Sequence, residues 1–119
     1  MNYVDGFVAA VPVANREIYR QYCTAAAAVF REHGALRVVE CWQDDVPTGK
    51  TTDFFMAVQA KADEAILFSW IEWPSKDARD AGWAALMADP RMDPAKHPMP
   101  FDGKRMIYGG FAPLVDAGG

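Results

Sequence analysis

Charged side chains embedded in apolar runs are the residues of this chain that could do chemistry. Glu40 lies in the run 36–43, Glu72 in the run 65–73, and Arg105 and Tyr108 in the last apolar segment. If both faces of these segments are covered, the carboxylates are partly buried, and burial raises a carboxyl pKa toward the range of a general base. We therefore take these four residues as catalytic candidates. The favoured alternative is a structural network of Arg–Glu pairs that fixes the register of a dimer.

A second set of residues could line a pocket for a planar ligand. Trp42 and Trp70 lie in extended runs with Arg37 nearby, and His97 and Phe101 belong to the proline-rich loop 91–101. Aromatic rings can enclose a flat molecule, and an imidazole can exchange protons near neutral pH. These five residues are the ligand-binding candidates. The alternative is that the tryptophans anchor a core or an interface and that His97 is solvated.

Metal and cofactor motifs are missing from the pattern. The two histidines and the two cysteines, Cys23 and Cys41, show no ligand spacing typical of a metal site. No glycine-rich loop opens a helix, and no serine elbow or nucleotide fingerprint occurs. The sequence therefore predicts no metal and no cofactor.

Composition limits the class of protein further. The chain has 119 residues, 51% hydrophobic and 24% charged, with a formal net charge of -4, which predicts one globular domain spanning residues 1–119. An acidic balance without a basic stripe argues against nucleic acid as a partner. No apolar stretch approaches the ~20 residues that cross a bilayer, and no secretory signal is visible. We expect a cytoplasmic protein with two free thiols and no membrane contact.

Hydrophobic periodicity predicts four strands, at 3–13, 36–43, 65–73 and 104–114, and two helices, at 15–33 and 75–89. Asn15 and Ser75 are the expected N-caps, and Gly34 the expected left-handed terminator. The run 53–59 reads as extended, either as a separate strand or as part of a bulged ribbon. Apolar stripes are expected at Ile18, Tyr22, Ala25, Ala26, Val29 and Phe30 in the first helix, and at Ala78, Ala81, Gly82, Ala85 and Leu86 in the second.

This order of elements indicates a ferredoxin-like α+β fold, with a split βαβ pattern, an antiparallel sheet and two helices on one face. The segment 65–73 is apolar on both faces, so both must be covered. Two helices can cover only one. A second copy on the open face is the simplest cover, which predicts a homodimer with twofold symmetry.

Five stretches carry a resemblance to a known family: YVDGF at 3–7, VECW at 39–42, FSWIEWPSK at 68–76, DPRM at 89–92 and MPFDGKRMIYGGF at 99–111. With these stretches the chain closely resembles the YbaA-like family, the domain of unknown function 1428. The resemblance implies the dimeric α/β-barrel superfamily and no established activity. That superfamily includes cofactor-independent monooxygenases, isomerases and ligand binders, so the fold does not select a reaction.

Three functions remain open from the sequence. The first is a homodimeric protein that binds a small molecule between sheet and helices, beneath the loop 91–101. The second is a cofactor-independent monooxygenase or isomerase, and the third is a purely structural dimer. A pocket of several hundred Å³ that holds Glu40 or Glu72 beside Arg105 or Tyr108 would favour the first.

Overall fold

A four-stranded antiparallel sheet organises the structure, a computed structural model that describes residues 2–118. The sheet has the order β2-β3-β1-β4. Along the chain its elements and the helices are β1 (Tyr3–Pro12), η1 (Val13–Asn15), α1 (Arg16–Glu32), β2 (Arg37–Trp42), α2 (Phe54–Ala57), β3 (Glu64–Trp73), α3 (Lys76–Met87), η2 (Pro90–Met92), η3 (Gly103–Arg105) and β4 (Ile107–Phe111).

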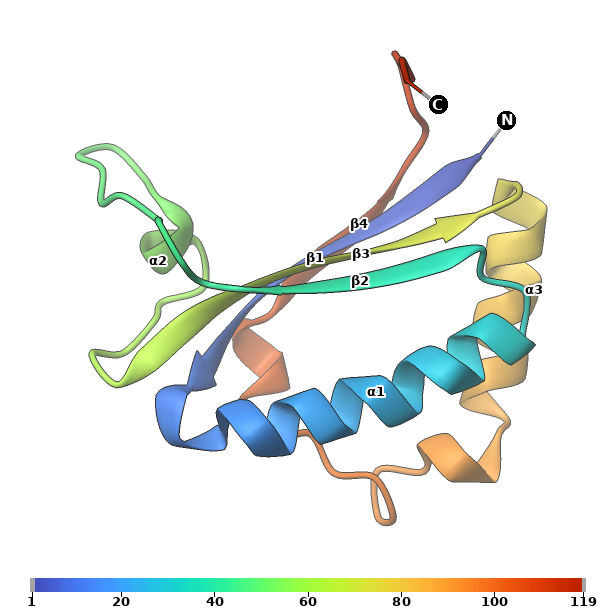
Figure 1. The fold of residues 1–119 in the computed structure, drawn as a ribbon, viewed down its shortest axis with the longest axis horizontal. Coiled ribbons are helices and arrows are strands. Elements are labelled where there is room, and N and C mark those ends of the chain that lie inside the picture. Colours follow the sequence, from blue (N-terminus) through green and yellow to red (C-terminus); the bar gives the residue numbers. More distant parts are fainter. Residues whose placement is uncertain (1, 119) are drawn as a thin grey trace.

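This is the ferredoxin-like arrangement that the sequence predicts. Helices α1 and α3 cover one face of the sheet, while the segment around α2 and the C-terminal tail rise on the opposite side (Figure 1). The first and last strands are neighbours, and Gly6 pairs with Gly109 across them. Because α1 and α3 cover only one face of the sheet, the other face is open in the single chain, and we call it the open face.

Local signals at the helix ends decide where the helices start and stop. The Ser75 hydroxyl accepts a hydrogen bond from the backbone N–H of Ala78 at 3.0 Å, as an N-cap should. Gly34 follows α1 with a φ of +109°, in the left-handed region that favours glycine. Asn15 is the N-cap residue of α1 as predicted, but the predicted capping hydrogen bond is wrong, because its side chain donates to the Pro100 carbonyl at 2.8 Å instead. Asn15 thus anchors the loop 91–101 to the start of α1.

The buried stripe of α1 is rotated from the prediction. Ile18 and Ala25 are exposed, and Tyr19 is buried in their place with Ala26, Val29 and Phe30. In α3, Ala81 is exposed while Gly82 and Leu86 are buried. Helical periodicity fixes the spacing of an apolar stripe. Where two adjacent stripes are similarly apolar, the elements packed against the helix decide which of them is buried.

Two predicted extended segments differ in the structure. The run 53–59 is not a strand: Asp53 accepts a hydrogen bond from the N–H of Met56 at 2.7 Å and starts the short helix α2. The last strand is shorter than predicted, because residues 103–105 form one turn of 3-10 helix, with the Asp102 carboxylate accepting from the N–H of Lys104 at 3.0 Å. In both places a capping aspartate outweighs the apolar pattern that follows it.

A buried carboxylate joins the helix layer to the sheet. Asp5, only 3% exposed, accepts hydrogen bonds from the indole N–H groups of Trp73 at 2.9 Å and Trp83 at 2.8 Å. Its other partner is the Arg79 guanidinium, at 2.8 Å from Nη2 and 3.0 Å from Nε. Three donor side chains thus surround the carboxylate, and they fix α3 over β1 and β3.

Candidate functional site

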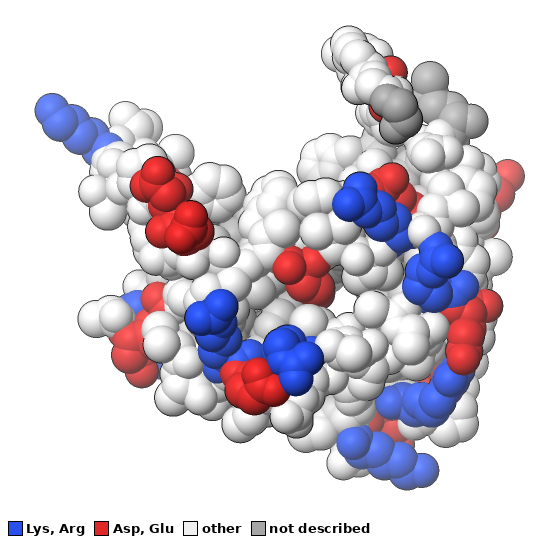
Figure 2. Space-filling model, in the orientation of Figure 1, with Lys and Arg blue, Asp and Glu red and all other residues white. Residues whose placement is uncertain are grey.

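A cavity of about 860 Å³ separates the helix layer from the sheet. Its floor is the helix-facing side of β1, β2 and β3, its wall is α1, and the segment 87–101 lies over it. Figure 2 shows the hollow between the edge of the sheet and α1, with an acidic side chain beside it. A cavity of this size suits a small organic molecule.

Glu40 is the carboxylate on the cavity floor. It faces α1 from the middle of β2, opposite Ser69 of β3. Glu40 is an exposed residue of β2, and its carboxylate lies among the side chains that line the cavity. Desolvation raises the pKa of Glu40 above its usual value, although hydrogen bonds from the Ser69 and Tyr19 hydroxyls oppose the rise. A carboxylate of this kind can accept a proton from a bound molecule.

Three side chains of α1 face Glu40. The Tyr19 hydroxyl donates to both carboxylate oxygens at 3.3 Å, and burial raises the pKa of Tyr19, so its proton stays in place. Burial raises the pKa values of Tyr22 and Cys23, and the nearby Glu40 charge raises them further, that of Cys23 to about 11. Cys23 is therefore a neutral thiol rather than a nucleophilic thiolate.

His97 and Phe101 bring the loop 91–101 to the cavity. The His97 ring stacks on Tyr22, with centroids 4.1 Å apart and an interplanar angle of 12°. Its Nε2 is buried and has no hydrogen-bond partner among the described residues. Phe101 meets Tyr19 edge-on with centroids 5.6 Å apart. A buried nitrogen without a partner is costly in a finished core and suits a site that receives a ligand.

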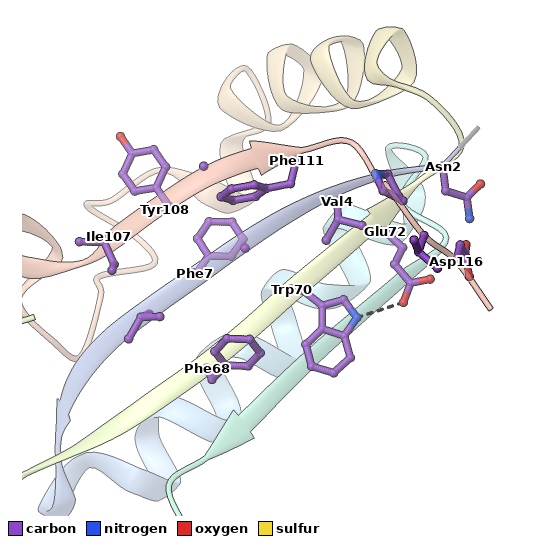
Figure 3. A pocket seen from close by; sticks show the side chains of 15 residues that line it. Asn2, Val4, Phe7, Phe68, Trp70, Glu72, Ile107, Tyr108, Phe111 and Asp116 are labelled. Carbon is purple, nitrogen blue, oxygen red and sulfur yellow. Dashed lines mark hydrogen bonds between the residues drawn. The ribbon is translucent and has the colours of Figure 1, made fainter. Parts of the chain in front are cut away.

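The remaining candidates are not in this cavity. Glu72 and Trp70 point from β3 to the open face, where the Trp70 indole donates to Glu72 at 3.0 Å (Figure 3). Tyr108 lines the same open-face groove and stacks on Phe7 with centroids 6.3 Å apart. The two predicted bases therefore lie on opposite faces of the sheet, and of these two it is Glu40 that shares a cavity with the helices.

Three other predicted residues have partners elsewhere. The exposed Arg37 guanidinium lies 3.8 Å from the half-buried Glu72 carboxylate. Trp42 packs at the end of β2, with the Arg16 guanidinium 5.4 Å from its ring centroid. Arg105 forms a two-pronged ion pair with Glu64, with both N···O distances 2.7 Å. This pair lies within one chain, so the alternative of an Arg–Glu network that fixes a dimer's register stays a prediction.

Sequence reasoning missed several cavity residues. Tyr19 interacts directly with Glu40, while Phe7 and Trp83 form part of the wall. The spacing of Tyr19, Tyr22, Ala26 and Phe30 along α1 was the available signal, but it competed with a stripe that began at Ile18. Within residues 2–118, no three His, Cys, Asp or Glu side chains gather as they would around a metal ion. In the same part of the chain, no helix combines the length and apolarity needed to cross a membrane.

Comparison with known proteins shows a match over nearly the whole chain. The family described as "Protein of unknown function (DUF1428)" matches residues 2–103. The "Uncharacterized protein YbaA" of Escherichia coli strain K12 is 58% identical over 116 residues, covering 98% of this chain and 99% of that protein. The protein of the same name from Shigella flexneri is equally similar.

Solved structures share the fold at low sequence identity. A mutant form of SnoaB, "a cofactor-independent oxygenase from Streptomyces nogalater", aligns with a TM-score of 0.60 and 16% identity over 97% of this chain and 95% of SnoaB. A "dimeric ferredoxin-like protein" from an uncultured marine organism gives a TM-score of 0.62 and 10% identity, covering 98% of this chain and 100% of that one. These likenesses establish a common fold, and the ferredoxin-like prediction is confirmed.

Proposed function

We propose that this chain, which belongs to the DUF1428 family, binds a small organic molecule in the cavity between sheet and helices. The observation that carries this is a cavity of about 860 Å³ holding both a carboxylate of raised pKa and a buried nitrogen without a partner among residues 2–118. A purely structural dimer would have little use for such a space, since interiors are normally filled.

The loop 91–101 is the cover of this site in our proposal. It is attached at one end by the Asn15–Pro100 hydrogen bond. At the other end Asp89 accepts from His33 Nε2 at 2.9 Å and from Arg91 at 2.7 Å. Between these anchors, His97 stacks on Tyr22. A ligand could enter by displacing this middle part while both ends stay attached.

Ligand-induced stabilisation tests the binding site directly. A thermal-shift screen of small aromatic molecules should find compounds that raise the melting temperature of the wild type, because a ligand bound to the folded state stabilises it. We expect Glu40→Gln to reduce the shift and Glu72→Gln, the same change on the open face, to preserve it. Ala27→Phe, which adds bulk at the cavity wall, should also reduce it. If no compound of a broad library stabilises the protein, the binding function is wrong.

A second candidate is catalysis by Glu40 as a general base, as in a cofactor-independent oxygenase or an isomerase. The raised pKa of Glu40 in a largely apolar cavity favours it, as does the likeness to SnoaB, which is described as such an oxygenase. Oxygen uptake or isomerisation of a bound compound, lost in Glu40→Gln, would distinguish this reaction from binding alone.

We also propose that the protein is a homodimer paired through the open face, in the reducing cytoplasm. The open-face groove is lined by apolar side chains of three strands and the tail, among them Val4, Phe68, Ile107 and Phe111 (Figure 3). Phe68 is 44% and Phe111 63% exposed in the single chain. A second apolar sheet would cover them.

A further inference from the structure

The cavity is lined by three acidic side chains and by one histidine, His97. Glu40, Asp89 and Asp93 line it, and no lysine or arginine does so among the lining residues of the described chain. Asp89 is already paired with Arg91 and His33 at the rim. Glu40 has no ion pair with any residue of 2–118 and receives hydroxyl groups instead. An anionic ligand beside Glu40 would meet a carboxylate that no lysine or arginine of the cavity lining compensates.

Two polar groups of the cavity, on Glu40 and His97, define what a ligand must offer. The carboxylate oxygens of Glu40 accept hydrogen bonds, and two of them come from one hydroxyl at the long distance of 3.3 Å. These oxygens can therefore accept a shorter bond from a ligand. The buried His97 Nε2, unpartnered within residues 2–118, provides a second polar contact.

Aromatic rings define the ligand's shape. Phe30 meets Trp83 edge-on with centroids 5.1 Å apart, and Phe7 lies 6.4 Å from the same indole. The Trp83 ring is in turn held by its hydrogen bond to Asp5. A fixed wall of edges and faces favours a flat aromatic molecule over a flexible aliphatic one.

We infer that the cavity takes an uncharged aromatic compound with an acidic hydroxyl, a phenol, whose O–H donates to Glu40. Carboxylates and phosphates are disfavoured by the lining charges. An aromatic ammonium could pair with Glu40, but the rest of the lining is mostly apolar and Asp89 is already paired, so few acceptors remain for its other N–H groups. A phenol gives the carboxylate one strong donor and leaves no charge of its own to bury.

Four matched probes test this inference, which rests on the proposed function: a naphthol, its methyl ether, the corresponding naphthoate and the corresponding naphthylmethylamine. They share one ring system and differ in the group offered to Glu40. Near neutral pH we expect the naphthol to bind at least about tenfold more tightly than the ether or the naphthoate, a difference of about 1.4 kcal/mol. Isothermal titration calorimetry measures each dissociation constant.

Two variants assign the preference to Glu40. In Glu40→Gln the naphthol should bind more weakly and the naphthoate more tightly, so that the ratio between them shrinks. Glu17→Gln removes the same charge from an exposed site of α1, where Glu17 is paired with Arg20, and should leave the ratio unchanged. Melting curves check that both variants are folded.

The outcomes separate this inference from the proposed function. If the ether or the naphthoate binds as well as the naphthol, or the amine binds better in a Glu40-dependent manner, the cavity binds ligands but the phenol assignment is overturned. The assignment is also overturned if Glu40→Gln leaves the ratio unchanged. If neither the probes nor the library of the thermal-shift screen bind, the proposed function itself fails.

Discussion

Asp5 and Glu40 show how acidic residues take two roles in this protein. Asp5 has three donor side chains around it and no room for a ligand. Glu40 has hydroxyl neighbours, no cation partner within residues 2–118 and an open space before it. The first carboxylate stabilises the fold, while the second is available to a bound molecule. The sequence predicts that both residues lie in strands, but it does not show which of them forms an ion pair with an arginine.

Asp5→Asn should destabilise the protein strongly. The amide keeps one acceptor but points a donor at Arg79 or an indole N–H, and it leaves the guanidinium without its buried counter-charge. Breaking a buried pair on one side typically costs about 3 kcal/mol. Urea denaturation would measure the loss. Asp80→Asn removes the exposed partner of the same arginine, and should change stability by less than about 1 kcal/mol. Equal effects would show that Asp5 has no special role.

At the scale of elements, the contact between η3 and the start of β3 depends on one ion pair. Arg105 binds Glu64 with two N···O distances of 2.7 Å and also donates to the Gln59 carbonyl at 2.9 Å. The pair lowers the pKa of Glu64 to about 2. It ties the segment before β4 to the turn before β3, although the two are not adjacent strands.

Because the pKa of Glu64 is lowered in the folded state, the stability of the protein should depend on pH. Ionised Glu64 stabilises the fold above its usual pKa of 4.5, and this contribution is lost as the pH falls from there through about 2. We expect Glu64→Gln to lower the melting temperature by several degrees at neutral pH, with the difference from wild type narrowing below about pH 4.5. Differential scanning calorimetry at a series of pH values measures the difference in melting temperature between the variant and the wild type. If this difference stays constant with pH, ionised Glu64 is not the source of the stabilisation. Glu17→Gln, at an exposed position, serves as the control.

Close packing between elements also depends on Gly82. A Cβ at this position of α3 would collide with the Trp73 ring and lie 2.8 Å from the His33 carbonyl oxygen. Glycine is a poor helix former, yet here its missing side chain lets α3 approach the sheet. The sequence placed Gly82 correctly in the buried stripe because its spacing fits. It could not show that the ring of Trp73 lies against it.

At the scale of the whole molecule, the two faces of the sheet differ in what covers them. The helix-facing side forms the cavity, and the open face carries exposed aromatic residues such as Phe68 and Phe111. The segment around α2 and the C-terminal tail rise on the open-face side (Figure 1). The two-faced apolar pattern of 65–73 predicted this division. In the single chain one of its faces is covered by helices, and the homodimer would cover the other.

Phe68→Lys tests the homodimer. Because Phe68 is exposed in the single chain, a lysine there should preserve the fold while placing a charge in the proposed interface. Sedimentation velocity should give about twice the chain mass of 13.2 kDa for the wild type and the chain mass for the variant. Ile18→Lys, an equal change at an exposed position of α1, should remain dimeric. A wild-type monomer at micromolar concentration would refute the interface.

The sequence by itself determined the fold class, the four strands, the two long helices and the open face, because hydrophobic period and capping residues act locally and repeat along each element. Glu40, His97 and Phe101 were also candidate site residues from the sequence. Only the tertiary structure decided that Glu40 and Glu72 lie on opposite faces, that Arg105 belongs to Glu64, and that Tyr19 rather than Ile18 turns inward. These outcomes depend on which side chains meet across elements distant in sequence, and a one-dimensional pattern does not contain those distances.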